Sequence, residues 1–123
     1  MEDIKTNNEK LEKAIAGYHM LMILSGVDGD FAKSEERVIK TYIKSNFDPS
    51  INLDSETNYL KSLKEDQYME CFVKAANDFL WSSEEQQRND FLDFAFKLIK
   101  ADDKITKEEN QFINELYNSW DFE

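Results

Sequence analysis

The sequence has little of what builds sheets or membrane spans. It contains three glycines and one proline, which leaves few places for the turns of a sheet protein, and strand alternation is hard to find. The longest unbroken apolar run covers only residues 20–24, far short of the about 20 residues that span a bilayer. The N-terminus also lacks the basic-then-apolar pattern of a signal peptide. We therefore expect a helical, cytoplasmic protein.

Cysteine and histidine occur once each, which excludes several classes of site. A single cysteine, Cys71, rules out a disulfide framework and a Cys-based zinc site. It stands within an apolar helical pattern, where we expect a buried thiol that acts as a small hydrophobe. His19 alone is a poor transition-metal site, so we assign it a structural role. No Ser–His or Cys–His constellation and no Gly-rich phosphate loop is recognisable, so we expect no enzyme.

Basic residues are few compared with acidic ones. Fifteen Lys and Arg stand against 26 Asp and Glu, which gives a formal net charge of −11. This charge repels phosphate backbones and anionic membranes, so nucleic acid and membrane insertion are not expected. Cations and basic protein surfaces are the partners that the charge favours, and the composition leaves the oligomeric state open.

Helical periodicity is what the sequence does contain. With 123 residues, 41% of them hydrophobic, the chain fits a single domain spanning residues 1–123. Apolar residues return every three or four positions in six stretches, as on one face of a helix. These stretches cover about residues 8–25, 33 to the break at 46–49, 55–64, 66–81, a fifth from a cap at Ser82 or Ser83 through Ile99, and a sixth from Thr106 through Trp120. The first carries Leu11, Ile15, Tyr18 and Met22 as its stripe. An all-α bundle is predicted.

Two acidic turns match one another without a gap. Residues 27–39 align with residues 101–113 at a constant offset, so that acid meets acid and the apolar pair at 38–39 meets the pair at 112–113. In each copy a large apolar residue, Phe31 or Ile105, would pack into the core and so anchor the turn between its flanking helices. The repeat predicts an internal duplication of helix-turn-helix hairpins with pseudo-twofold symmetry, in a compact bundle of about six to seven helices.

The acids of these turns admit two interpretations. Thr106 and Glu109 have the spacing of a capping box, so helix capping on a solvated face explains the second turn. Ala32 replaces that threonine in the first turn, which leaves Glu35 less well explained. Neither turn completes an EF-hand, because the upstream positions lack the oxygen ligands that calcium needs. If the two turns meet, however, four clustered carboxylates would hold protons at raised pKa values or recruit a hard divalent cation.

The repeated acid-Gly, apolar, Ser/Thr, Glu turn in a helical domain resembles the TerB-like family, which is named for a tellurite-resistance protein and includes part of a DnaJ-type co-chaperone. The resemblance covers residues 14–120. It implies an all-α domain with a pseudo-twofold arrangement and metal-binding acids, in bacterial stress systems. The residues that match the family pattern are Asp28, Glu35, Asp102 and Glu109, with Asp30 and Asp103 as additional candidates.

Two departures from the family pattern accompany this match. Ala32 stands where Ser or Thr is expected, and Asp103 replaces the glycine of the second turn. The expected function is a non-catalytic, cation-binding domain of a tellurite- or metal-resistance type of stress response. Calcium or magnesium is the expected ion rather than zinc, and other stress-system proteins are possible partners. The alternative is an acidic protein–protein interaction module without metal.

Overall fold

The structure is a computed structural model that describes residues 2–26, 33–99 and 107–120. Within these ranges it contains helices and no strand, as predicted. The elements are α1 (Glu2–Gly26), α2 (Lys33–Asn46), α3 (Asp54–Ser62), the short 3₁₀ helix η1 (Glu65–Gln67), α4 (Tyr68–Ser82), α5 (Glu85–Ile99) and α6 (Lys107–Trp120). The expected all-α bundle is confirmed, while the internal duplication stays a prediction.

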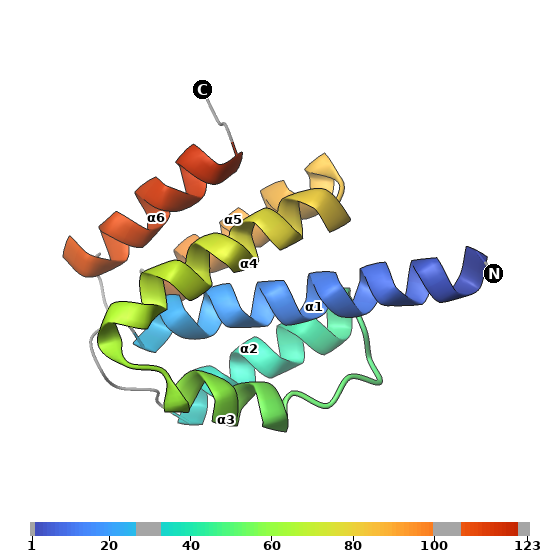
Figure 1. The fold of residues 1–123 in the computed structure, drawn as a ribbon, viewed down its shortest axis with the longest axis horizontal. Helices are drawn as coiled ribbons and strands as arrows, with labels where there is room; N and C mark the ends of the chain where they lie inside the picture. The colour runs from blue at the N-terminus through green and yellow to red at the C-terminus, as the bar shows by residue number, and fades with distance from the viewer. Residues whose placement is uncertain (1, 27–32, 100–106, 121–123) are drawn as a thin grey trace.

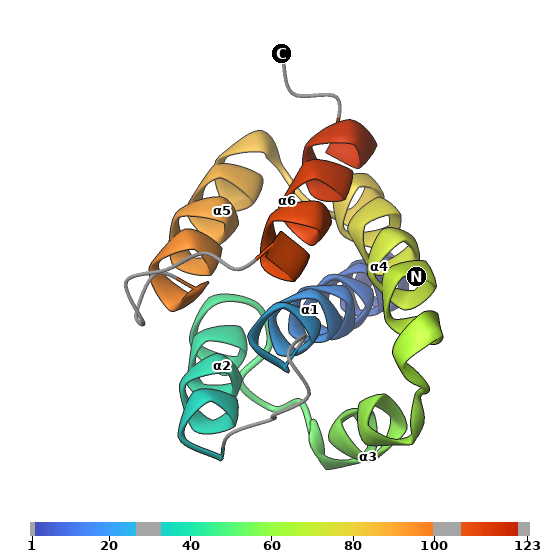
Figure 2. The same cartoon turned by 90° about the vertical axis from the view of Figure 1, so that its left-hand side faces the viewer.

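Helix α1 is the centre of the bundle (Figures 1 and 2). It contacts α2, α3, α4 and α5, and Figure 2 shows it nearly end-on with these helices around it. Residues 20–24 are therefore buried on every side, each with at most 1% of its surface exposed. At Gly17 an added Cβ would lie 3.2 Å from Ile43 Cδ1 and 3.4 Å from Phe91 Cε2. Glycine thus lets α1 come close to α2 and α5.

Aromatic side chains fill the core between α4, α5 and α6. Phe79 of α4 is fully buried and packs on Phe91 at 4.8 Å and on Trp120 at 5.5 Å between ring centroids. Trp120 donates its indole N–H to the carbonyl oxygen of Ala76 at 2.8 Å. Because a buried indole needs such an acceptor, this bond fixes the end of α6 on α4.

A buried polar contact attaches α3 to α1. The hydroxyls of Tyr18 and Thr57 are hydrogen-bonded, and both residues are buried. Thr57 Oγ1 donates to the carbonyl oxygen of Leu53 at 3.0 Å, so the Tyr18 hydroxyl is the donor toward Thr57. The Tyr18 hydroxyl is thereby satisfied within the core rather than by solvent.

The first helix begins earlier than expected, at Glu2 rather than near residue 8, and the cap of α5 also differs from expectation. We expected Ser82 or Ser83 to cap α5, but their hydroxyls donate backward to the carbonyl oxygens of Asp78 and Phe79 in α4. The start of α5 is held instead by Gln87, whose Oε1 accepts from the Glu84 backbone N–H at 2.9 Å. A side-chain oxygen three residues into the helix thus binds back to the cap residue, as in a capping box.

Candidate functional site

The predicted acidic site is only partly within the described residues. Glu35 and Glu109 lie in the first turns of α2 and α6, and both are half-buried. The two helices begin on the same side of the molecule, the side that faces the reader in Figure 2. The other four predicted residues lie outside the described residues, namely Asp28, Asp30, Asp102 and Asp103. Over the described ranges, no three His, Cys, Asp or Glu side chains gather as metal ligands.

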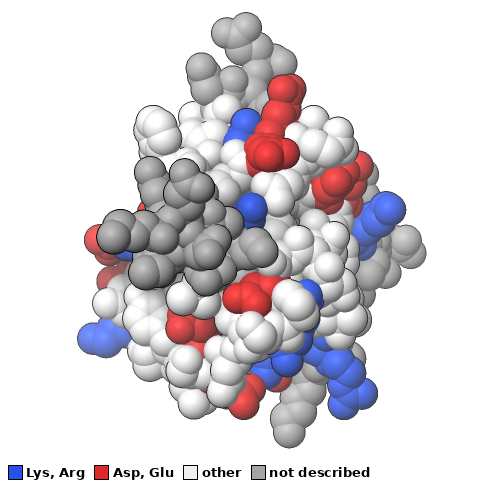
Figure 3. All heavy atoms as spheres, turned by 90° about the vertical axis from the view of Figure 1, so that its right-hand side faces the viewer, with Lys and Arg blue, Asp and Glu red and all other residues white. Residues whose placement is uncertain are grey.

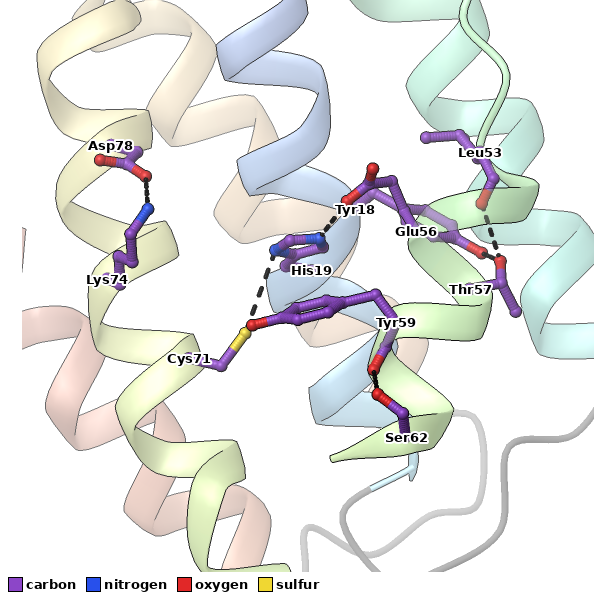
Figure 4. Close-up of polar contacts among 10 residues, drawn as sticks. All are labelled: Tyr18, His19, Leu53, Glu56, Thr57, Tyr59, Ser62, Cys71, Lys74 and Asp78. Atoms are coloured by element: carbon purple, nitrogen blue, oxygen red, sulfur yellow. Dashed lines mark hydrogen bonds and ion pairs between the residues drawn. The ribbon is translucent and has the colours of Figure 1, made fainter. Parts of the chain in front are cut away.

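A second candidate site is a groove between α1, α3 and α4 (Figure 4). Its volume is about 500 Å³, within the range of small-molecule pockets. Apolar side chains of α1 and α4 form part of its wall. Its polar lining residues are Glu12, His19, Glu56, Tyr59, Cys71, Lys74 and Asp78.

His19 lies at the middle of the groove. Its Nε2 is 2.8 Å from Glu56 Oε1 of α3, and its ring lies 5.6 Å from the ring of Tyr59. Burial lowers the pKa of His19, and the hydrogen bond to Glu56 only partly opposes this effect. The imidazole is therefore neutral at pH 7. Because a carboxylate can only accept, Nε2 carries the hydrogen and Nδ1 is left with its lone pair.

Cys71 faces that lone pair from α4. Its Sγ lies 4.0 Å from His19 Nδ1, and the Tyr59 hydroxyl points toward the same sulfur (Figure 4). Burial raises the pKa of the Cys71 thiol, and this effect outweighs the lowering by the charge of Lys74 and by the hydrogen bond with Tyr59. The side chain is half-buried rather than fully enclosed. At neutral pH the group is thus a thiol positioned beside a proton acceptor.

Sequence reasoning missed this cluster. We found no Cys–His constellation and treated both residues as structural, but the fold brings them together with Glu56. Cys71 and His19 are 52 residues apart and belong to no short motif. Only the packing of α4 on α1 places them side by side, so no local sequence signal could have found the pair.

Lys74 and Asp78 close the groove on the α4 side. Lys74 Nζ lies 3.0 Å from Asp78 Oδ2, one helical turn away. Glu12 of α1 and Glu56 add two further carboxylates to the lining. With His19 neutral, three acidic groups stand against one basic group, so the groove favours positively charged molecules.

The lowered pKa of His19 predicts a pH dependence of stability. The unfolded chain takes up a proton near pH 6.5, while folded His19 does so only at lower pH. Stability should therefore fall as the pH drops below about 6.5, because the unfolded state then binds more protons. Denaturant unfolding at several pH values should show that the free energy of unfolding falls less on acidification for His19→Gln than for the wild type. Parallel pH profiles, or an NMR titration with a pKa above 6.5, would contradict this.

The remaining surface does not outline another site on the face shown in Figure 3. Acidic side chains lie there in several separate groups, with basic and uncharged side chains between them. None of the helices in the described ranges combines the length and the apolar character needed to cross a membrane.

Comparison with known proteins supports the family resemblance. The family model described as "Tellurite resistance protein TerB" matches residues 13–122, nearly the whole chain. Comparisons with curated proteins and with solved structures gave no match. The helical bundle agrees with the all-α domain that the resemblance implied. The chain belongs to the TerB family.

Proposed function

We propose that this TerB-family domain is a non-catalytic module that binds a divalent cation through its paired acidic turns. The cation is calcium or magnesium, because the candidate ligands are carboxylate oxygens rather than the sulfur and nitrogen that suit zinc. The family description suggests a role in a bacterial tellurite- or metal-type stress response. We place this role in the cytoplasm.

The observation that carries this proposal is the matched position of the two turns. Each turn directly precedes a helix, and Glu35 and Glu109 occupy the first turn of α2 and α6. Both helices begin on one side of the molecule (Figure 2). Carboxylates that lie close together repel one another, and a hard cation relieves that repulsion while gaining oxygen ligands.

The test is a titration of metal-stripped protein with Ca²⁺, Mg²⁺ and Zn²⁺. Calorimetry measures binding of each ion, and thermal unfolding measures its effect on Tm. A ligand at 100 times its Kd stabilises the folded state by about 2.7 kcal/mol, which raises Tm by several degrees. We expect such a shift with Ca²⁺ or Mg²⁺. Calorimetry distinguishes one shared ion from one ion at each turn. The absence of binding by any of the three ions would overturn the proposal.

A matched pair of double variants identifies the ligands. Asp28→Asn/Asp102→Asn should lose the shift, whereas Glu70→Gln/Asp93→Asn should keep it. The control pair removes the same charge from exposed positions on α4 and α5. The alternative function, an acidic module for a basic protein partner, predicts that neither double variant changes the response to cations.

A further inference from the structure

Three helices contribute one reactive group each to the groove. Cys71 comes from α4, His19 from α1 and Glu56 from α3 (Figure 4). We infer that Cys71 is a reactive thiol that forms mixed disulfides with small, amine-bearing disulfides. His19 accepts its proton, and Glu56 orients His19. The lining residues of this groove include none of the six acidic candidates for cation binding, and the inference does not depend on cation binding.

The hydrogen-bond chain gives each group its role. Glu56 Oε1 holds the Nε2–H of His19 at 2.8 Å, which fixes both the orientation and the tautomer of the ring. The Nδ1 lone pair then faces Cys71 Sγ at 4.0 Å. A nucleophile beside a base, with a third group orienting the base, is the arrangement of activated nucleophiles in general. Such contacts often tighten once a substrate has displaced water.

The thiol needs this base because its surroundings do not ionise it. Burial raises the pKa of Cys71, so the free thiolate is scarce at pH 7. Burial also keeps His19 neutral and therefore able to accept a proton. The charged groups near the pair are Glu12 on α1, Glu56 on α3, and Lys74 and Asp78 on α4, with the Tyr59 hydroxyl beside the sulfur.

Disulfide exchange is the chemistry that this set of groups can perform. The proton of Cys71 moves to His19 Nδ1, and the thiolate attacks one sulfur of the small disulfide. A bond forms from Cys71 to that sulfur while the original S–S bond breaks. The departing thiolate then takes the proton from His19 and leaves as a thiol. Cys71 is oxidised to the mixed disulfide, and the other half of the reagent is reduced. Acyl transfer would also require donors for an oxyanion.

The charge of the groove selects the reagent. Glu12, Glu56 and Asp78 outnumber Lys74, and Lys74 is paired with Asp78 at 3.0 Å. An amine-bearing disulfide is attracted to this lining, and a carboxylate-bearing one is repelled. The volume of about 500 Å³ accommodates a molecule of this size.

The experiment measures adduct formation on the full chain by mass spectrometry. Because the sequence has one cysteine, every adduct reports on Cys71. The probes are cystamine (cationic), bis(2-hydroxyethyl) disulfide (neutral) and dithiodiglycolate (anionic). We expect cystamine to react fastest and dithiodiglycolate slowest, with a difference that shrinks at high salt. Equal rates for the three probes, or reaction only after unfolding in urea, would overturn the proposal.

Variants separate a base from a merely structural histidine. His19→Gln should slow the reaction with cystamine at pH 7 by tenfold or more, within the usual range for general-base assistance. Its rate should then rise tenfold per pH unit like that of an ordinary thiol, whereas the wild-type rate levels off once His19 is neutral. Identical pH profiles would show that His19 is not the base. Should His19→Gln fail to fold, Glu56→Gln tests the same hydrogen-bond chain. This variant should shift the pH profile of the reaction rate away from that of the wild type.

Glu12→Gln and Glu70→Gln form the matched charge test. Both residues are exposed carboxylates, but only Glu12 lines the groove. Glu12→Gln should reduce the preference for cystamine over dithiodiglycolate, and Glu70→Gln should leave it unchanged. An equal effect of both substitutions would assign the preference to the net charge of the chain rather than to the groove.

Discussion

Replacing Ile23 with lysine is expected to abolish cooperative unfolding. Ile23 has no exposed surface and lies within the buried run at 20–24 of α1, the helix that contacts α2, α3, α4 and α5. A lysine there must either bury an unpaired charge or lose its proton. The cost is about 4 kcal/mol or more, against a total stability of about 5–15 kcal/mol for a typical domain.

Circular dichroism during heating measures this effect, and Leu11→Lys is the matched control. Leu11 is on the same helix but is 42% exposed, so a lysine there can reach water. We expect its Tm to remain close to that of the wild type. A sharp, wild-type-like transition for Ile23→Lys would contradict the central position of α1.

Replacing Phe79 with alanine should give the second-largest loss. Phe79 is fully buried and its ring contacts Phe47, Phe91 and Trp120. Its removal eliminates buried apolar surface and leaves a cavity, which costs about 3–5 kcal/mol. The corresponding decrease in Tm is roughly 10–20 °C.

Urea unfolding provides the measurement, with Trp81→Ala as the control. Trp81 lies two residues after Phe79 on α4 but is 87% exposed, so its removal should change stability by less than about 0.5 kcal/mol. If both alanine variants unfold at the same urea concentration, the packing of Phe79 in the aromatic core does not stabilise the fold.

The helices themselves were predictable from the sequence, because each carries its own apolar period and a break at its end. The environment of α1 was not predictable from the sequence. Its pattern predicted a single inward stripe that included Leu11, yet Leu11 is exposed and residues 20–24 are buried all round. A local pattern records the apolar face of a helix but not how many neighbours surround it. Tyr59 of α3 likewise belongs to an apolar pattern, yet it is 48% exposed and lines the groove.

The candidate sites show the same distinction. The acidic turns were recognisable because all their residues lie within two short, matching segments. Their metal-binding role stays a prediction. The cluster of Cys71, His19 and Glu56 was not recognisable, since its members come from three helices and meet only after folding. Spacing along the chain contains no information about such a meeting.

The central position of α1 also affects the order in which the protein can fold during synthesis. α1 leaves the ribosome before the other described helices, yet its most extensive partner is α4, which is synthesised only after α2 and α3. Among the described helices, α2 and α3 are the main partners of α1 that are synthesised before α4. The nascent chain therefore exposes its most hydrophobic segment for much of translation, and such exposure is what chaperones bind. Fast elongation through α4 would shorten that interval.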